Sequence, residues 1–180
     1  MNRIKFALSF VFIFFVGNIL AQDEEGVKWY SFTEAVKLNE ENPKKIFVDV
    51  YTDWCGWCKK MDKATFAHPL IAEYMNKHFY SVKLDAERKD TVQFKGYTFV
   101  NQNPEGRRSS HQLAQALLNG KMSYPSYAFL NEKNEVITGV PGYHPPERFE
   151  AILHFFGEEA FIDTKWEDYN KSFKGSIEKE

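Results

Sequence analysis

The chain has 180 residues, and its 23 basic residues nearly balance its 25 acidic ones, so the formal net charge is −2. This balance gives no indication of a nucleic-acid partner. Two cysteines are too few for a small secreted scaffold held by disulfides, because one local bridge closes a short loop and stabilises little. The aromatic content of 17% predicts a core rich in rings.

Residues 1–21 are predicted to be a cleaved secretory signal peptide. Arg3 and Lys5 give a positive start, and residues 6–16 form an apolar run. This run is shorter than the roughly 20 residues of a membrane-spanning helix, so an uncleaved anchor is the less favoured alternative. Residues 22–180 are then expected to form a single exported domain, with the periplasm as its compartment. Its 21 basic and 25 acidic residues give a net charge of about −4.

A short strand, a helix and a buried strand are the first expected elements. Residues 27–30 are predicted to form a short edge strand. Ser31 and Glu34 have the spacing of a capping box, which predicts a helix that ends at residues 42–43. The apolar run from Ile46 to Tyr51 is typical of a buried strand.

Both cysteines follow this strand directly, in the sequence Trp54-Cys55-Gly56-Trp57-Cys58. Two thiols separated by two residues can close a disulfide. If a helix begins near Gly56, Cys55 lies in its first turn, where unpaired N–H groups and the positive end of the helix dipole stabilise a thiolate. A two-cysteine motif at a strand-to-helix junction therefore predicts a redox-active pair.

Two helices and a strand are expected next. The first helix runs from Gly56 to about Lys63 and ends in a break at residues 65–68. Pro69 suits the first turn of the second helix. Residues 80–84 are predicted to form another core strand. The buried stripe of the second helix is expected to comprise Leu70, Ile71, Tyr74 and Met75.

The segment 86–120 has a less regular pattern. Residues 92–99 predict a small hairpin that turns at Lys95-Gly96. A short helix is then expected, with Ser109 or Ser110 as its N-cap and Gly120 as its stop. Its apolar positions are predicted to be Leu113, Ala116 and Leu117.

The remaining chain predicts a hairpin and two helices. Residues 131–134 join two strand-like runs, and Pro146 opens a helix that Gly157 closes. A final helix is expected over about 162–174, docked on the body of the domain, and the residues after it are expected to fray. The apolar faces of the two helices are predicted to comprise Phe149, Ile152, Leu153 and Phe156, and then Ile162, Trp166, Tyr169 and Phe173.

This order of elements resembles the thioredoxin fold, an α/β fold in which helices flank a central mixed sheet. The likeness includes the Cys-Gly-Trp-Cys motif after the first core strand and a lone proline, Pro125, before the third. Val48 to Cys55 resembles the thioredoxin run in which an acidic residue points beneath the active site, and Asp49 is its counterpart here.

The resemblance extends to one branch of the thioredoxin-like superfamily. Tyr51 to Lys59, with Thr65-Phe66, is similar to the extracytoplasmic branch that includes the C-terminal domain of DsbD and many small secreted bacterial proteins. The likeness covers roughly Trp29 to Phe156. Trp57 departs from it by replacing a proline, and residues 86–120 form an insertion before the cis-proline segment.

The resemblance implies roles for four catalytic residues. Cys55 exchanges with a substrate disulfide, and Cys58 resolves the mixed disulfide. A buried Asp49 would have a raised pKa and take the proton of Cys58, while Lys83 moderates that shift. The structural alternatives are a hydrogen-bonded strand carboxylate for Asp49 and a solvated strand-end lysine for Lys83.

The resemblance also implies a substrate-binding set. Pro125 is expected in the cis form, and Tyr124 would offer its backbone to the substrate chain. Trp54 and Trp57 flank the thiols and are expected to form an apolar rim, with core packing as the alternative role. The expected substrate-binding residues are therefore Trp54, Gly56, Trp57, Tyr124 and Pro125.

Together these features predict an extracytoplasmic thiol:disulfide oxidoreductase that reduces protein disulfides. The alternatives are a disulfide oxidase or isomerase, and a non-catalytic thioredoxin-like binding module with a static disulfide. Expected partners are protein thiols and disulfides and an upstream redox protein, with no nucleic acid and no stable membrane insertion after signal cleavage. No cofactor is expected beyond the Cys55–Cys58 disulfide. No metal site is expected either, because the five histidines show no paired spacing with the thiols.

Overall fold

The computed structural model describes residues 26–178. The predicted signal peptide, residues 1–21, lies outside this range. Within it, none of the helices has the length and apolar character needed to cross a bilayer. The strands are β1 (Trp29–Tyr30), β2 (Lys45–Tyr51), β3 (Phe79–Asp85), β4 (Val92–Phe94), β5 (Tyr97–Phe99), β6 (Ser126–Leu130) and β7 (Val136–Pro141). The α-helices are α1 (Phe32–Glu41), α2 (Gly56–Met61), α3 (Pro69–His78), α4 (Gln112–Leu117), α5 (Pro146–Gly157) and α6 (Trp166–Ser172).

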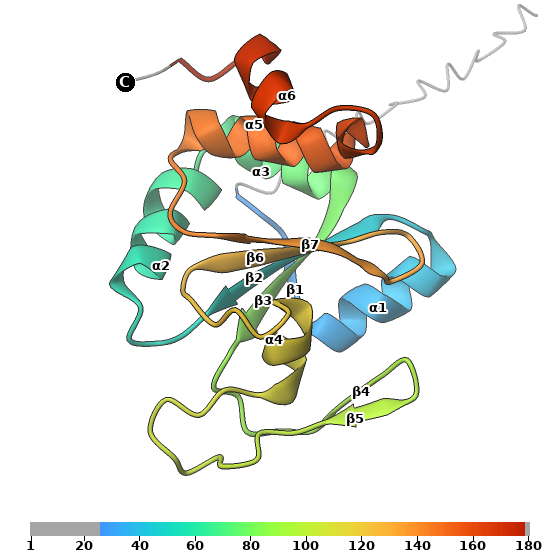
Figure 1. The fold of residues 1–180 in the computed structure, drawn as a ribbon, viewed down its shortest axis with the longest axis vertical. Coiled ribbons are helices and arrows are strands. Elements are labelled where there is room, and N and C mark those ends of the chain that lie inside the picture. Colours follow the sequence, from blue (N-terminus) through green and yellow to red (C-terminus); the bar gives the residue numbers. More distant parts are fainter. Residues whose placement is uncertain (1–25, 179–180) are drawn as a thin grey trace, which may run out of the picture.

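Five strands form a mixed central sheet in the order β1-β3-β2-β6-β7. β1 and β2 run parallel to β3, whereas β6 is antiparallel to β2 and β7 is antiparallel to β6. Helices α3 and α5 cover one face of the sheet, and α1 and α4 cover the other (Figure 1). β4 and β5 form a separate hairpin below α1 and α4. The expected α/β fold is therefore confirmed.

Side chains alternate between the two faces of the sheet along β2, so each face has its own hydrophobic core. Ile46, Val48 and Val50 belong to one buried cluster, whereas Phe47 belongs to the other. All residues of β2 except Tyr51 are buried. This central strand ends at Tyr51, directly before the turn that carries the cysteine motif, so the core holds that turn at a defined edge of the sheet.

Several local predictions are confirmed. Ser31 and Glu34 form the expected capping box at the start of α1, and Asn42 is its C-cap. The hairpin of β4 and β5 turns at Lys95 and Gly96, which both have positive φ. The 131–134 turn joins β6 and β7 as an antiparallel pair. Short-range capping and turn patterns thus describe these segments well.

The break expected at residues 65–68 begins too early. A π-helix, Asp62–Phe66, continues directly from α2. Thr65 and Phe66 are buried in it, and the Thr65 hydroxyl donates a hydrogen bond to the His144 carbonyl at 2.8 Å. Because both side chains have partners in the core, the helical segment ends only after Phe66.

The residues predicted to be buried in α3 and α4 are partly wrong. In α3 the buried residues are Ile71, Ala72 and Met75, whereas Leu70 is 41% exposed because it lies in the first turn, off the packed face. In α4 it is Ala114, and not Ala116, that packs inward with Leu113 and Leu117.

The N-cap of α4 is His111, and not Ser109 or Ser110. Its Nδ1 accepts the Leu113 N–H at 3.1 Å. Its Nε2 lies 2.9 Å from the Asp90 carbonyl, so the imidazole bridges the helix start to the preceding loop. The Ser109 hydroxyl instead donates to the Asn101 side chain at 2.7 Å.

The C-terminal segment differs from the single helix predicted over 162–174. A 3₁₀ turn, Ala160–Ile162, precedes α6, and Ile162 is 63% exposed. Residues 175–178 do not fray as the sequence predicts. The buried Glu150 carboxylate on α5 accepts the N–H groups of Ser176 and Ile177 at 2.7 and 3.1 Å, which fastens this segment to α5.

Candidate active site

Cys55 and Cys58 lie at the start of α2 and form a disulfide with an S–S distance of 2.05 Å. Cys55 is the N-cap of α2, and its Sγ accepts the Cys58 N–H at 3.0 Å. The Cys55 N–H donates to the Thr52 carbonyl at 3.0 Å, which fixes the turn after β2. Cys55 therefore lies where the free N–H groups of a helix favour negative charge on sulfur.

Exposure does not distinguish the two cysteines. Cys55 is 4% exposed and Cys58 is 2% exposed, so both are buried in the disulfide form and Cys55 is only slightly the more exposed. The Cys55 sulfur is turned toward α2, where it bonds to Cys58 and accepts its N–H. What separates the cysteines is their place in the helix, because Cys55 precedes its first turn and Cys58 lies within it.

A partly buried lysine on β3 joins two carboxylates. The Lys83 ammonium on β3 donates to Asp49 Oδ2 at 2.7 Å, and it also contacts Asp62 Oδ1. Asp49 is only 1% exposed. Asp62 lies one helical turn after Cys58, at the start of the π-helix. We call Asp49, Lys83 and Asp62 the carboxylate–lysine cluster. The cluster connects β2 and β3 to the helical segment that holds the cysteines.

Aromatic rings surround the ammonium of this cluster. Lys83 Nζ lies 5.0 Å from the ring centre of Trp29, 5.1 Å from that of Tyr51 and 5.4 Å from that of Phe66. Ring faces attract a cation, and this attraction offsets part of the cost of removing the ammonium from water. Lys83 is therefore not the solvated strand-end lysine of the structural alternative.

Burial sets the protonation of the cluster. It raises the pKa of the Asp49 carboxyl to about 6, although the Lys83 ammonium opposes the rise and Asp62 adds to it. Burial lowers the pKa of Lys83, but Asp49 and Asp62 outweigh this effect and hold that pKa above its ordinary value. Lys83 thus keeps its proton, and Asp49 is the group that can gain or lose one near neutral pH.

Asp49 also has a free acceptor atom. Its Oδ1 is buried and has no hydrogen-bond partner among residues 26–178, whereas Oδ2 is taken by Lys83. Tyr127, opposite Asp49 in the β2–β6 register, likewise has a buried hydroxyl without a partner in that range. Burial raises the pKa of this phenol, so it stays neutral. One Asp49 oxygen is therefore available for a proton.

The expected rim residues surround the cysteine motif. The Tyr124–Pro125 peptide bond is cis. Trp54 is 51% exposed and its ring centre lies 5.8 Å from that of Tyr124 in an edge-to-face arrangement. Trp57 is 57% exposed and contacts Tyr143 at 5.3 Å. Both tryptophans are half exposed, so neither is the core residue of the packing alternative.

Three site residues were missed from the sequence. Asp62 binds Lys83, Glu87 accepts the Trp54 Nε1–H at 3.1 Å, and Arg108 lies over the Trp54 ring at 4.9 Å. The sequence could have indicated Asp62, because a residue four places after Cys58 lies on the same face of a helix. Glu87 and Arg108 belong to the 86–120 insertion, whose path to the site no local pattern indicates.

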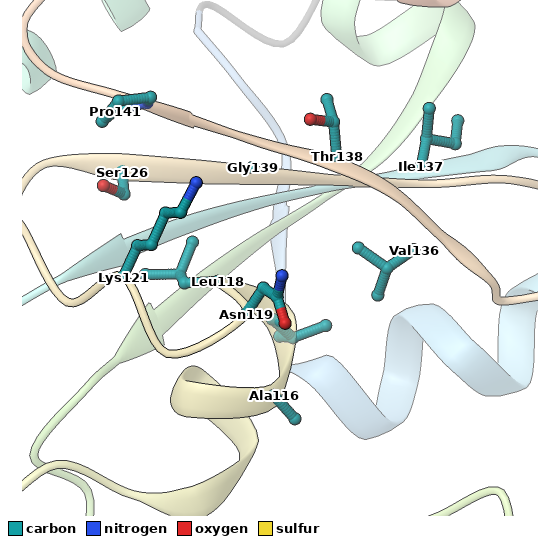
Figure 2. A pocket seen from close by; sticks show the side chains of 11 residues that line it. Ala116, Leu118, Asn119, Lys121, Ser126, Val136, Ile137, Thr138, Gly139 and Pro141 are labelled. Carbon is teal, nitrogen blue, oxygen red and sulfur yellow. The ribbon is translucent and has the colours of Figure 1, made fainter.

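Two further features were tested as sites. Within residues 26–178, no three side chains of His, Cys, Asp or Glu gather in a way that suits a metal ion. A pocket of about 410 Å³ lies between α4 and the edge strand β7 (Figure 2). Of the residues that line it, all in the described part of the chain, only Lys121 is titratable, so it offers no acid–base pair. The lining residues are Ala116, Leu117, Leu118, Asn119, Lys121, Ser126, Val136, Ile137, Thr138, Gly139 and Pro141.

Comparison with known proteins gives consistent matches. A protein-family model described as "Thioredox_DsbH: Protein of unknown function, DUF255" matches residues 17–179. An uncharacterized protein of Caenorhabditis elegans is 27% identical over 157 residues, which are 87% of this chain and 19% of that protein. Disulfide bond reductase DsbH of Chlamydia pneumoniae is 24% identical over 122 residues, 66% of this chain and 64% of that protein. This chain thus spans less than two thirds of the length of either relative.

The fold comparison agrees with the sequence matches. A solved structure described as DsbH oxidoreductase superposes with a TM-score of 0.54 and 16% identity, covering 74% of this chain and 85% of that one. At this identity the likeness establishes the fold alone. Together with the family match, it confirms the resemblance to the thioredoxin-like superfamily.

Proposed function

Since the chain belongs to the thioredoxin-like family described as Thioredox_DsbH, we propose that it is an extracytoplasmic enzyme that reduces protein disulfides through Cys55 and Cys58. One observation carries this proposal. The cysteine pair lies at the N-terminus of α2, and Lys83 and Asp62 link the helical segment that continues α2 to a buried Asp49 whose pKa is raised and whose Oδ1 has no partner among residues 26–178. A static structural disulfide has no need of a titrating carboxylate linked to its helix.

The reaction begins from the reduced protein. The Cys55 thiolate, stabilised by the helix N-terminus, attacks one sulfur of a client disulfide, and the other client sulfur leaves as a thiolate. Cys58 then gives its proton to Asp49 Oδ1 and attacks the Cys55 sulfur. This step closes the Cys55–Cys58 disulfide and releases the second client thiolate. The client gains two electrons, which an upstream dithiol protein returns to the enzyme.

The tryptophan rim and the cis-proline segment supply substrate binding in this proposal. The backbone of Tyr124 pairs with an extended client chain, as a strand pairs at a sheet edge. Trp54, Gly56 and Trp57 border the place where the client sulfur enters. The half-exposed rings remove water from the exchanging sulfurs and add apolar contact with an unfolded segment.

Insulin reduction tests the activity. We expect the wild-type protein to catalyse it with dithiothreitol as the electron source, Cys55→Ser to abolish catalysis, and Cys58→Ser to accumulate mixed disulfides with clients. A Ser172→Ala variant, changed on the distant α6, serves as the control. If the wild-type disulfide resists dithiothreitol until the protein unfolds, the chain is the static binding module.

Equilibration with glutathione mixtures tests the direction, with Trp54 fluorescence as the readout. A reductant should have a potential more negative than about −200 mV, on the thioredoxin side of the scale. A potential near that of a strong oxidant, about −120 mV, would instead identify an oxidase.

Cell fractionation tests the proposed compartment. The full-length protein, expressed in a Gram-negative host, should be recovered from the periplasm with its N-terminus at Gln22. Recovery from the cytoplasm with residues 1–21 still attached would contradict export.

A further inference from the structure

Resting on the proposed function, we infer that Lys60 and Arg108 select client segments with acidic side chains on both sides of the exchanging cysteine. Each of these cations lies against one of the two exposed tryptophans of the cysteine motif. We call Lys60 and Arg108, with the rings they contact, the cationic rim.

On one side, the insertion holds Trp54. The Arg108 guanidinium lies 4.9 Å from the centre of the Trp54 ring, and Glu87 accepts the indole N–H at 3.1 Å. The Trp54 ring also packs edge-to-face against the Tyr124 ring. Three residues thus fix the orientation of an indole that remains 51% exposed, which prepares it for contact with a client chain.

On the other side, α2 provides a similar arrangement. Lys60 Nζ lies 5.1 Å from the centre of the Trp57 ring and 4.8 Å from that of Tyr143. Each exposed tryptophan therefore has a cation over it. Neither Lys60 nor Arg108 forms an ion pair with a carboxylate of residues 26–178, so both positive charges are available to a client.

Carboxylates also line the surface beside Arg108. A hollow of about 640 Å³ beside Trp54 is lined by both signs. Within it, Glu87 is engaged by the Trp54 indole, and Asp85 accepts the Glu87 N–H at 2.9 Å. The lining also includes Asp53 and Glu105, so four acidic residues stand beside four basic ones. Among the basic ones, Arg88 and Lys89 form ion pairs, whereas Arg107 and Arg108 are exposed and form none with residues 26–178. Asp85 and Glu87 are only partly exposed.

The backbone at Arg108 supports a role for this residue. Its φ is 60°, in the left-handed region that side chains other than glycine seldom adopt. It lies in the loop between β5 and α4, at the lower left of Figure 1, close to where α2 begins. The loop thus keeps a costly conformation at the residue that covers Trp54, as is common at binding sites.

The charge of the cationic rim indicates which client segments it binds. Cations over both exposed tryptophans favour a chain with Glu or Asp flanking its cysteine, because each carboxylate can pair with one cation. The whole protein carries net negative charge, so this local patch, and not the overall field, would favour acidic clients.

Peptide substrates test the inference. The probes are three peptides that differ only in the residues flanking one cysteine, Glu, Gln or Lys, with that cysteine in a mixed disulfide with thionitrobenzoate. Reduced protein attacks the peptide sulfur and releases the coloured thiolate, whose appearance gives a second-order rate constant. For the wild type we expect the Glu peptide to react about fivefold faster than the Lys peptide, and the preference to weaken in high salt.

Variants identify the source of the preference. Arg108→Glu and Lys60→Glu should each lower the Glu-to-Lys rate ratio about fivefold, whereas Arg108→Lys should keep most of it. Lys171→Glu makes the same charge change on α6, which lies at the top of Figure 1 over α5, and should leave the ratio at the wild-type value.

The outcomes separate this inference from the proposed function. A wild-type protein that reacts with the small disulfide dithiobis(nitrobenzoate) but shows equal rates for the three peptides overturns the cationic rim and leaves the enzyme standing. An equal effect of Lys171→Glu also overturns it. A reduced protein that reacts with none of these disulfides defeats the proposed function itself.

Discussion

The two faces of the central sheet are built from different side chains. The face toward α1 and α4 is mainly aliphatic, with Val48, Val82 and Leu113 among its buried residues. The face toward α3 and α5 is mainly aromatic and centred on Phe47. The carboxylate–lysine cluster lies on the aromatic face, because Asp49 and Phe47 project from the same side of β2.

This difference between the faces shows how the partly buried Lys83 ammonium is stabilised. Aliphatic side chains can only exclude water from an ammonium, whereas ring faces also attract it. Trp29, Tyr51 and Phe66 surround Lys83 in this way. The aliphatic face supplies uniform apolar packing, and the aromatic face combines packing with the solvation of an ion.

Truncating one residue on each face should give the largest effects. Phe47 contacts the rings of Trp29, Phe66, Phe79, Tyr127, Phe129 and Phe149. We expect Phe47→Ala to lower the free energy of unfolding by about 4 kcal/mol, because it leaves a cavity among these rings. Val48→Ala, its neighbour on the other face, should cost about 1.5 kcal/mol. Urea unfolding of the oxidised protein measures both, and equal losses would remove the distinction between the faces.

Neutralising the buried carboxylate should give the next largest effect. The pKa of Asp49 is about 6 in the folded protein, above the value of about 4 expected when unfolded, so the folded state binds this proton more tightly. The resulting stability is complete below pH 4 and is lost as the pH rises from about 4 to 6. Asp49→Asn should therefore be about 3 kcal/mol more stable than the wild type at pH 7.5 and about equally stable at pH 4.

Urea unfolding at both pH values checks this expectation. The same variant should slow the release of mixed disulfides, because Cys58 loses its proton acceptor. A variant that is less stable than the wild type at pH 7.5 would indicate that the Lys83 ion pair outweighs the burial of Asp49.

Removing the second carboxylate of the cluster should have the smallest effect. Asp62 raises the pKa of Asp49 through its charge, and it shares the Lys83 ammonium. We expect Asp62→Asn to lower the pKa of Asp49, as followed by the ¹³C resonance of the Asp49 carboxyl during titration. Glu73→Gln, on the exposed side of α3, should leave that titration unchanged. An upward shift in the Asp62 variant would mean that Asp62 acts by holding Lys83 in place.

Patterns of short range account for what the sequence predicted well. The buried strand β2, the start of α2 beside Cys55 and the capping box at Ser31 each depend on neighbours within a few residues. The cis bond before Pro125 was expected only through family resemblance, since nothing local distinguishes it.

Long-range contacts account for what was missed. His111 caps α4 with the help of the Asp90 carbonyl, and Arg108 reaches Trp54 across the fold. Ile177 was expected to fray because the donors and the acceptor of its anchor, on Glu150, are far apart in sequence. Asp62 is intermediate, because its spacing from Cys58 was visible but its partner Lys83 lies on another element.

The hydrogen bonds between Glu150 and residues 176–177 can form only late in the synthesis of the chain. The Glu150 carboxylate on α5 accepts N–H groups from residues 26 and 27 positions later in the chain. At roughly 5–20 residues per second, a ribosome needs more than a second to supply them after α5 is made. Until residue 177 has been made, the Glu150 carboxylate lacks both N–H donors and needs water in their place, so α5 can bury this acid as it is in the complete fold only after that point.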